Sequence, residues 1–282
     1  MNDESTILSV GIDIGTSTTQ VIFSRLTFKN SAGYFAVPHI AIVDKEVVFK
    51  SEIYTTPLLD RIRIDGEGVR RIVAGEFKKS GFTPEDVQTG AVIITGESAR
   101  KENSEIVLQE LSDFAGEFVV STAGPDLEAI IAGKGSGARQ YSIDHQCVTV
   151  NLDIGGGTTN AVVFDAGDVI AKGCLDIGGR LIRVDASRRI EYISDSVKQI
   201  GESCGISLRV GESVDYSMLF EISSAMAELL YQWLQGGALP ILKQITTPGS
   251  TELISDKKIR AVCFSGGVAD CIYYPEDRKS VV

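Results

Sequence analysis

The chain has 282 residues, of which 43% are hydrophobic and 23% are charged, a balance typical of globular proteins that bury a core. A formal net charge of −11 argues against nucleic acid or an anionic membrane surface as the main partner, because both repel an acidic protein. The sequence has no apolar run that spans a bilayer, no signal-peptide layout and no disulfide or zinc spacing among its cysteines, so we expect a cytoplasmic protein.

The first half of the chain alternates predicted strands and helices. Strands at 7–14 and 19–28 flank a Gly/Ser/Thr turn, and the β-branched and aromatic residues after the turn favour a strand over a helix. More short strands are expected within 33–51, with a turn at Asp44 and Lys45. The later elements are a helix within 66–87 that Gly81 and Pro84 stop, a strand at 90–98, a helix within 103–118, a strand at 117–124 and a short helix that begins at Pro125.

The second half opens in the same way as the first. Residues 148–179 predict a strand, a glycine turn, a strand, a second turn and a third strand. A broad apolar stripe predicts a helix at 216–234, which two glycines end, and 246–253 is expected to be a surface loop. Residues 258–270 predict a strand followed by another glycine turn. The chain is therefore expected to form two similar β-rich α/β domains, 1–147 and 148–282.

One phrase occurs in both halves, as "VGIDIGTSTTQVIFS" at 10–24 and "NLDIGGGTTNAVVFD" at 151–165. A glycine turn after a strand exposes several backbone N–H groups in a concavity that suits phosphate oxygens, and threonine hydroxyls add donors. An aspartate just before such a turn can hold Mg²⁺ or its waters. Neither turn has the lysine of a P-loop, and neither opens a helix as the dinucleotide fingerprint does.

The two copies suggest one triphosphate held between two opposed loops, with Asp13 and Asp153 flanking a single Mg²⁺. One such turn alone is often an ordinary hairpin, but a third glycine turn after a strand near 265–268 suits an adenosine and favours a nucleotide site. The residues expected to bind ATP are Gly15, Thr16, Ser17, Thr18 and Thr19 in the first turn, Gly155, Gly156, Gly157, Thr158 and Thr159 in the second, and Ser265, Gly266 and Gly267 in the third.

Two further positions have both a functional and a structural interpretation. Glu97 follows a buried strand and enters a glycine turn, so it either positions an attacking water, as a catalytic residue beside Asp13 and Asp153, or is a solvated turn residue. Gly178 and Gly179 form a second Asp-Ile-Gly-Gly turn, which is either close to the nucleotide or a tight bend.

These motifs resemble those of the actin, sugar kinase and Hsp70 superfamily of ATPases, whose fold is two ribonuclease-H-like domains around a nucleotide cleft. The blocks "GAVIITGESARKEN", "FVVSTAGPDLEAIIAGKGSGA", "CLDIGGRLI" and "FSGGVADC" are also similar, in family order, to the ethanolamine ammonia-lyase reactivating factors (EutA). This resemblance implies ATP and Mg²⁺ as cofactors and ethanolamine ammonia-lyase as partner, whose damaged cobalamin is exchanged for adenosylcobalamin. It also implies a bacterial microcompartment setting and leaves homo-oligomerisation open. Family members continue past the adenosine motif, so a C-terminal part of the fold is expected to be missing.

Two alternatives share the same fold, a small-molecule kinase and a polymerising actin-like scaffold. A kinase needs a substrate pocket and a catalytic base, and the sequence has no clear sugar-site signature. A scaffold needs self-complementary surfaces, which a sequence does not reveal. Fold alone does not decide among these functions. The order of the similar blocks favours the reactivating factor, with ATP hydrolysis expected in the full-length form.

Overall fold

The computed structural model describes residues 4–15, 18–30, 40–60, 63–95, 98, 101–115, 119–122, 124–253 and 256–274. The chain divides into two compact units, Met1–Ala123 and Gly124–Val282. This division lies earlier than the boundary expected after residue 147, because helices α3 (Pro125–Gly135) and α4 (Ala138–Asp144) pack on the sheet of the second unit. Gly133 makes that packing close, since a Cβ atom there would lie 2.3 Å from Val162 Cγ1.

The first unit contains a six-stranded mixed sheet. Its strand order is β3-β2-β1-β5-β6, with β4 paired to β2. Strand β2 is antiparallel to each of its partners, β1, β3 and β4. Strand β5 is parallel to both of its partners, β1 and β6. The strands are β1 (Glu4–Ile14), β2 (Thr18–Asn30), β3 (Ile40–Lys50), β4 (Tyr54–Thr55), β5 (Thr89–Ile94) and β6 (Val119–Thr122).

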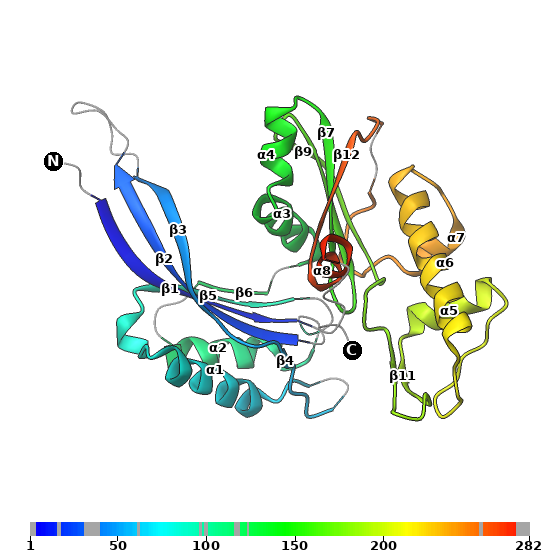
Figure 1. Ribbon diagram of the computed structural model, residues 1–282, viewed down its shortest axis with the longest axis horizontal. Helices are drawn as coiled ribbons and strands as arrows, with labels where there is room; N and C mark the ends of the chain where they lie inside the picture. The colour runs from blue at the N-terminus through cyan, green and yellow to red at the C-terminus, as the bar shows by residue number, and fades with distance from the viewer. Residues whose placement is uncertain are drawn as a thin grey trace. The chain divides into compact units, whose positions relative to one another are not determined.

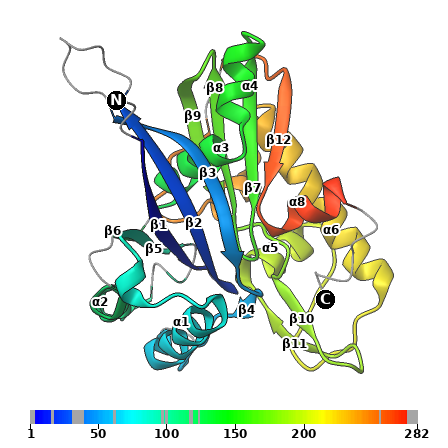
Figure 2. The same ribbon diagram turned by 60° about the vertical axis from the view of Figure 1, so that its left-hand side comes forward.

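Helices α1 (Gly66–Ser80) and α2 (Ser104–Ala115) lie on the same side of this sheet in both ribbon views (Figures 1 and 2). They bury one face of β1 and β2 in a core that includes Ile12, Phe23 and Val73. Helix α1 begins where the Asp65 side chain accepts a hydrogen bond from Gly68 N, and it ends at Gly81 in the left-handed conformation (φ 77°). The predicted helix and its end are thus confirmed. A single 3₁₀ turn, Pro84–Asp86, follows.

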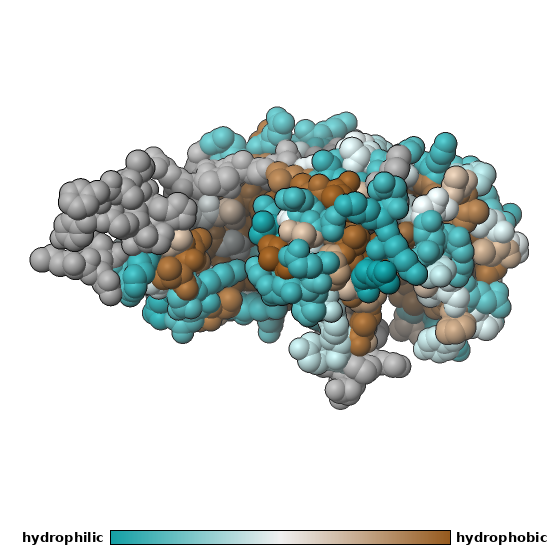
Figure 3. All heavy atoms as spheres, turned by 90° about the horizontal axis from the view of Figure 1, so that it is seen from above, coloured by the Kyte–Doolittle hydropathy of each residue, from teal (hydrophilic) through white to brown (hydrophobic). Residues whose placement is uncertain are grey.

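The turn expected at Asp44 and Lys45 is wrong, because β3 continues through both residues. Asp44 pairs with Thr27 and Lys45 pairs with Leu26 of β2. The long strand β2 gives the backbone groups of Asp44 and Lys45 hydrogen-bond partners. The pairing of β2 with β3 shifts its register at two places along the strands. β3 is an edge strand of the sheet, and Figure 3 shows hydrophobic side chains among hydrophilic ones toward this outer end of the unit. The exposed apolar residues of β3 are Ile40, Ile42, Val43 and Val47.

The second unit is built on a four-stranded sheet in the order β12-β7-β8-β9. The β12–β7 pair is parallel and the other two pairs are antiparallel. The strands are β7 (Val148–Ile154), β8 (Thr159–Asp165), β9 (Asp168–Leu175) and β12 (Ala261–Ser265), with a separate β10 (Ile182–Val184) and β11 (Ile190–Ile193) pair. The remaining helices are α5 (Asp195–Ser203), α6 (Tyr216–Leu234), α7 (Pro240–Gln244) and α8 (Gly267–Tyr273).

Helices cover both faces of the second sheet (Figure 1). Val162 and Phe164 pack against α3 and α4 on one face, while Leu152 and Val163 join Trp233 of α6 on the other. This two-sided coverage explains why every residue of β7 and β8 is buried except Asp153 and Asp165, which are half-buried. The helix predicted at 216–234 is confirmed with the same limits. Across the described ranges, no helix combines the length and the apolar character needed to cross a membrane.

Candidate functional site

The phrase that occurs twice in the sequence forms the same hairpin twice in the structure. Asp13 faces Gln20 across the β1–β2 hairpin, and Asp153 faces Asn160 across the β7–β8 hairpin. The register is the same because every equivalent pair is offset by 140 positions (153 − 13). In each turn the glycine N–H donates to the carbonyl of the threonine three residues on, at 2.8 Å for Gly15–Thr18 and 3.0 Å for Gly155–Thr158.

Side-chain hydroxyl groups of the first unit make hydrogen bonds to and around the first turn. Thr19 is fully buried, and its Oγ1 lies 3.1 Å from Oγ1 of Thr56. Thr56 donates to the carbonyl of Gly15 at 2.9 Å, and Ser98 donates to the same carbonyl at 3.0 Å. The inward carbonyl of Gly15 is therefore satisfied by side chains from two other segments. This places Ser98, which directly follows Glu97 in the sequence, at the first turn.

Asp13 lies beside the first turn with an exposed side chain. Thr95 Oγ1 donates to its Oδ1 over a long distance of 3.4 Å. The expected ligands Thr16 and Ser17, and the candidate catalytic residue Glu97, lie outside the described residues.

Backbone groups hold the second turn. The buried Thr159 donates through its Oγ1 to the carbonyl of Ile177 at 2.7 Å. Gly179 N donates to the carbonyl of Gly155 at 2.9 Å, and Arg180 N donates to that of Gly156 at 2.8 Å. The structure thus brings the 178–179 turn against the second hairpin, where its N–H groups support the hairpin's carbonyls.

Two glycines allow neighbouring turns to touch the second hairpin. A Cβ atom on Gly178 would lie 2.6 Å from the carbonyl carbon and oxygen of Gly156. Gly266 has a φ of 82°, and a Cβ atom there would lie 2.4 Å from the carbonyl oxygen of Ile154. Only glycine fits at such positions without a backbone shift. Three of the predicted glycine turns, at 155–157, 178–179 and 266–267, therefore converge within the second unit.

Asp153 lies at the centre of this convergence. Ser265 Oγ donates to its Oδ1 at 2.6 Å, and Ser265 in turn accepts a hydrogen bond from Asn151 Nδ2 at 2.9 Å. Asn160 also donates to the Asp153 carboxylate. Burial raises the pKa of Asp153 above its usual range, and the hydrogen bonds from Ser265 and Asn160 lower that pKa in part.

Sequence reasoning did not find the roles of Asn151 and Asn160. Both side chains are buried, and within the described part of the chain the Oδ1 atom of each has no hydrogen-bond partner. An unpaired buried oxygen is costly, and a bound cation or its water would satisfy it. The signal in the sequence was an asparagine at each end of the stretch "NLDIGGGTTN", on either side of the glycine turn.

The described residues include no group of three or more His, Cys, Asp or Glu side chains that could hold a metal ion. Mg²⁺ commonly takes only one or two protein carboxylates and completes its shell with water and phosphate oxygens. The surroundings of Asp153 suit such a cation, because a positive charge would stabilise the carboxylate that burial disfavours. The two unpaired carboxamide oxygens beside it point to the same fit.

The chain is similar to known proteins along nearly its whole length. A family model described as ethanolamine utilisation protein EutA matches residues 5–282. The ethanolamine ammonia-lyase reactivases EutA of Salmonella typhimurium and of Escherichia coli are each 37% identical to it over 265 residues. That match covers 94% of this chain and 56% of each relative, so the chain spans about half the length of these curated relatives.

A solved structure supports the fold. The Aquifex aeolicus PPX-GPPA enzyme superposes with a TM-score of 0.53 at 16% sequence identity, covering 98% of this chain and 75% of that chain. This likeness concerns the fold alone. The predicted α/β class is confirmed, because mixed β-sheets and helices make up both units.

Proposed function

The chain belongs to the family of ethanolamine utilisation protein EutA, and on this ground we propose that it forms the nucleotide-binding part of an ATP-dependent reactivase. The reactivase would act on ethanolamine ammonia-lyase and exchange its damaged cobalamin for adenosylcobalamin. The observation that carries this proposal is 37% identity, across 94% of this chain, to two proteins named ethanolamine ammonia-lyase reactivase EutA. Because the chain spans 56% of those relatives, the activity is proposed for a protein of their full length.

The two hairpins are proposed to bind the phosphates of one ATP. Backbone N–H groups of the glycine turns would donate to phosphate oxygens, and the turns at 178–179 and 266–267 keep the second hairpin in shape. Asp13 and Asp153 would hold Mg²⁺, which when bound neutralises charge on the phosphate oxygens. Two features of this chain support the proposal, namely the identical register of the hairpins and the unpaired oxygens beside Asp153.

The residues around each carboxylate have separable roles in this proposal. Ser265 and Asn160 would orient Asp153, since both donate hydrogen bonds to it. Glu97 would orient the attacking water near the first turn, a role supported by the bond that its neighbour Ser98 makes to Gly15. Hydrolysis would then change the protein's affinity for the lyase, because a nucleotide shifts an equilibrium only by its differential affinity for two states.

A reactivation assay tests the function. Lyase blocked with cyanocobalamin is mixed with adenosylcobalamin, ATP, Mg²⁺ and a chimera in which this chain replaces the matching part of a full-length relative. Lyase activity should return only when all components are present, and Asp153→Asn in the chimera should prevent the return. Equal recovery without ATP would refute the motor role. Transfer of phosphate to a small acceptor would favour the kinase, and sedimentable ATP-dependent filaments would favour the scaffold.

A further inference from the structure

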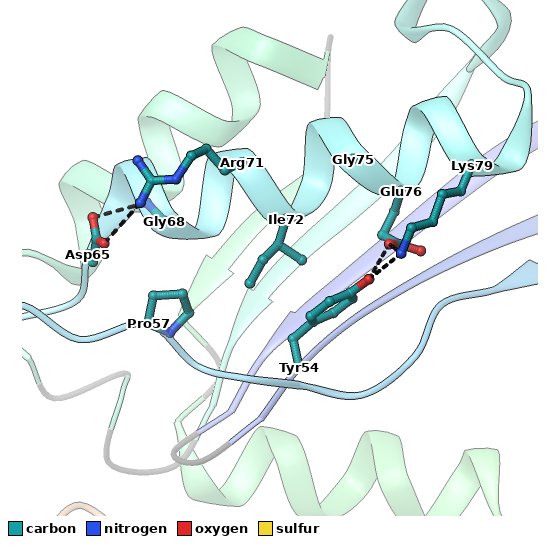
Figure 4. Close-up of a pocket in the computed structure, with 9 residues that line it drawn as sticks. All are labelled: Tyr54, Pro57, Asp65, Gly68, Arg71, Ile72, Gly75, Glu76 and Lys79. Atoms are coloured by element: carbon teal, nitrogen blue, oxygen red, sulfur yellow. Dashed lines mark hydrogen bonds and ion pairs between the residues drawn. The ribbon is translucent and has the colours of Figure 1, made fainter.

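A groove of about 350 Å³ lies in the first unit between helix α1 and the segment 54–57 (Figure 4). None of the residues that line it belongs to a glycine turn of the candidate site. Its apolar part is made by Pro57, Ile72 and the ring of Tyr54. Figure 4 shows Ile72 between two charged pairs, Asp65 with Arg71 at one end and Glu76 with Lys79 at the other.

Gly75 keeps the middle of this groove open. Glycine inside a helix destabilises it relative to alanine, so a packing reason is expected at such a position. Gly68 has one, because a Cβ atom there would lie 2.7 Å from Cβ of Pro57. Gly75 has none, since a Cβ atom there would meet nothing within 4 Å. The space over Gly75 is therefore available to a ligand that binds in the groove.

The acidic groups of the groove are already engaged by the protein. The side chain of Glu76 is only 2% exposed, and its carboxylate accepts hydrogen bonds from Tyr54 and from Lys79, the latter at 2.8 Å. Asp65 accepts from Gly68 N at 2.9 Å as the cap of α1. A ligand therefore finds few acceptors here.

The basic groups have donors to spare. Arg71 has five N–H donors, its side chain is 71% exposed, and in the described part of the chain it has one ion pair, at 3.5 Å to Asp65. Lys79 is 56% exposed and donates to Tyr54 at 2.7 Å and to Glu76, which leaves one of its three donors. The groove thus offers donors at both ends and an apolar surface between them, which selects an anionic ligand with an apolar middle.

The spacing of the two cations indicates the shape of that ligand. Arg71 and Lys79 are eight positions apart on a helix, which separates them by about 12 Å along its axis. In an extended polypeptide, residues four positions apart lie on the same face and are separated by about 13 Å. A small molecule would not be enclosed here, because both cations are more than half exposed. We propose that the groove binds an extended acidic segment of a partner polypeptide, with carboxylates on Arg71 and Lys79 and an apolar side chain over Gly75.

Fluorescence anisotropy with the 282-residue chain, without nucleotide, tests the proposal. The probe is a fluorescein-labelled Glu-Thr-Val-Thr-Glu peptide, and its Gln-Thr-Val-Thr-Gln analogue is the uncharged control. Gly75→Leu places a bulky side chain at the groove, where a Cβ atom would meet nothing within 4 Å, and Arg71→Gln removes one cation. Each variant should weaken binding roughly tenfold, because charge-assisted contacts and an apolar contact are of that order. Ala74→Leu, an exposed substitution of the adjacent residue that does not line the groove, should leave affinity unchanged.

Four results would overturn the proposal. The first is probe affinity that Gly75→Leu leaves unchanged while circular dichroism shows a folded variant. The second is equal binding of the glutamine analogue, which would remove the role of the two cations. The third is free glutarate displacing the probe as well as the unlabelled peptide does, which would make this a small-molecule site. Absence of any binding at millimolar peptide would also refute it.

Discussion

Replacing Gly266 by alanine tests whether the third glycine turn holds the second hairpin in place. Gly266 has φ 82° and ψ 174°, a conformation that essentially only glycine adopts. The added Cβ atom would lie 2.4 Å from the carbonyl oxygen of Ile154 and 2.7 Å from its carbonyl carbon. Both neighbours are backbone atoms at the end of β7, so no side-chain rotation relieves the clash.

The magnitude follows from two costs. The backbone conformation costs a residue other than glycine about 1–3 kcal/mol. Moving β7 away from the new methyl group resembles overpacking of a core, which costs a further ~1–3 kcal/mol. We expect Gly266→Ala to lower the free energy of unfolding of the second unit by about 2–6 kcal/mol, a large fraction of the roughly 5–15 kcal/mol typical of a domain.

The single tryptophan makes the measurement specific. Trp233 is buried in the core of the second unit, so its fluorescence during urea unfolding reports that unit. Gly267→Ala is the matched control, because a Cβ atom there would meet nothing within 4 Å and the residue begins α8. It should change the unfolding free energy by less than about 0.5 kcal/mol. A loss below about 1 kcal/mol for Gly266→Ala, or an equal loss for Gly267→Ala, would refute the reasoning.

Three further predictions concern the candidate site and its surroundings. Asp13→Asn and Asp153→Asn should each lower Mg²⁺-dependent ATP hydrolysis at least about tenfold. Nucleotide affinity, measured by calorimetry, should change less, because backbone N–H groups still bind phosphate. Unchanged hydrolysis in both variants would remove the carboxylates from the mechanism. Ser265→Ala should cost about 1–3 kcal/mol of unfolding free energy, because it leaves Asp153 and the buried Asn151 amide without a shared partner; a neutral effect would mean that the network carries no energy. Burial raises the pKa of the Cys174 thiol to about 12. Iodoacetamide at pH 8 should therefore label the exposed Cys204 first and Cys174 only after unfolding, as followed by peptide mass spectrometry. Early labelling of Cys174 would contradict its burial.

The sequence by itself determined the elements whose signals are local. Helix α6 has the limits that its apolar periodicity predicts, and α1 ends at Gly81, which adopts the left-handed conformation. The two glycine hairpins follow from the same kind of information, since glycines and β-branched residues within a short stretch decide between a turn and a strand. The order of strand and helix signals along the chain was enough to predict an α/β protein with two β-rich units.

Only the tertiary structure decided what depends on partners distant in the sequence. Asp44 and Lys45 are strand residues because β2 supplies their pairing, and helices α3 and α4 belong to the second unit because its sheet buries them. The bonds from Ser265 to Asp153 and from Asn151 to Ser265 join residues separated by more than a hundred positions. Composition and periodicity describe each segment alone, whereas burial and hydrogen bonding depend on which segments come to lie side by side.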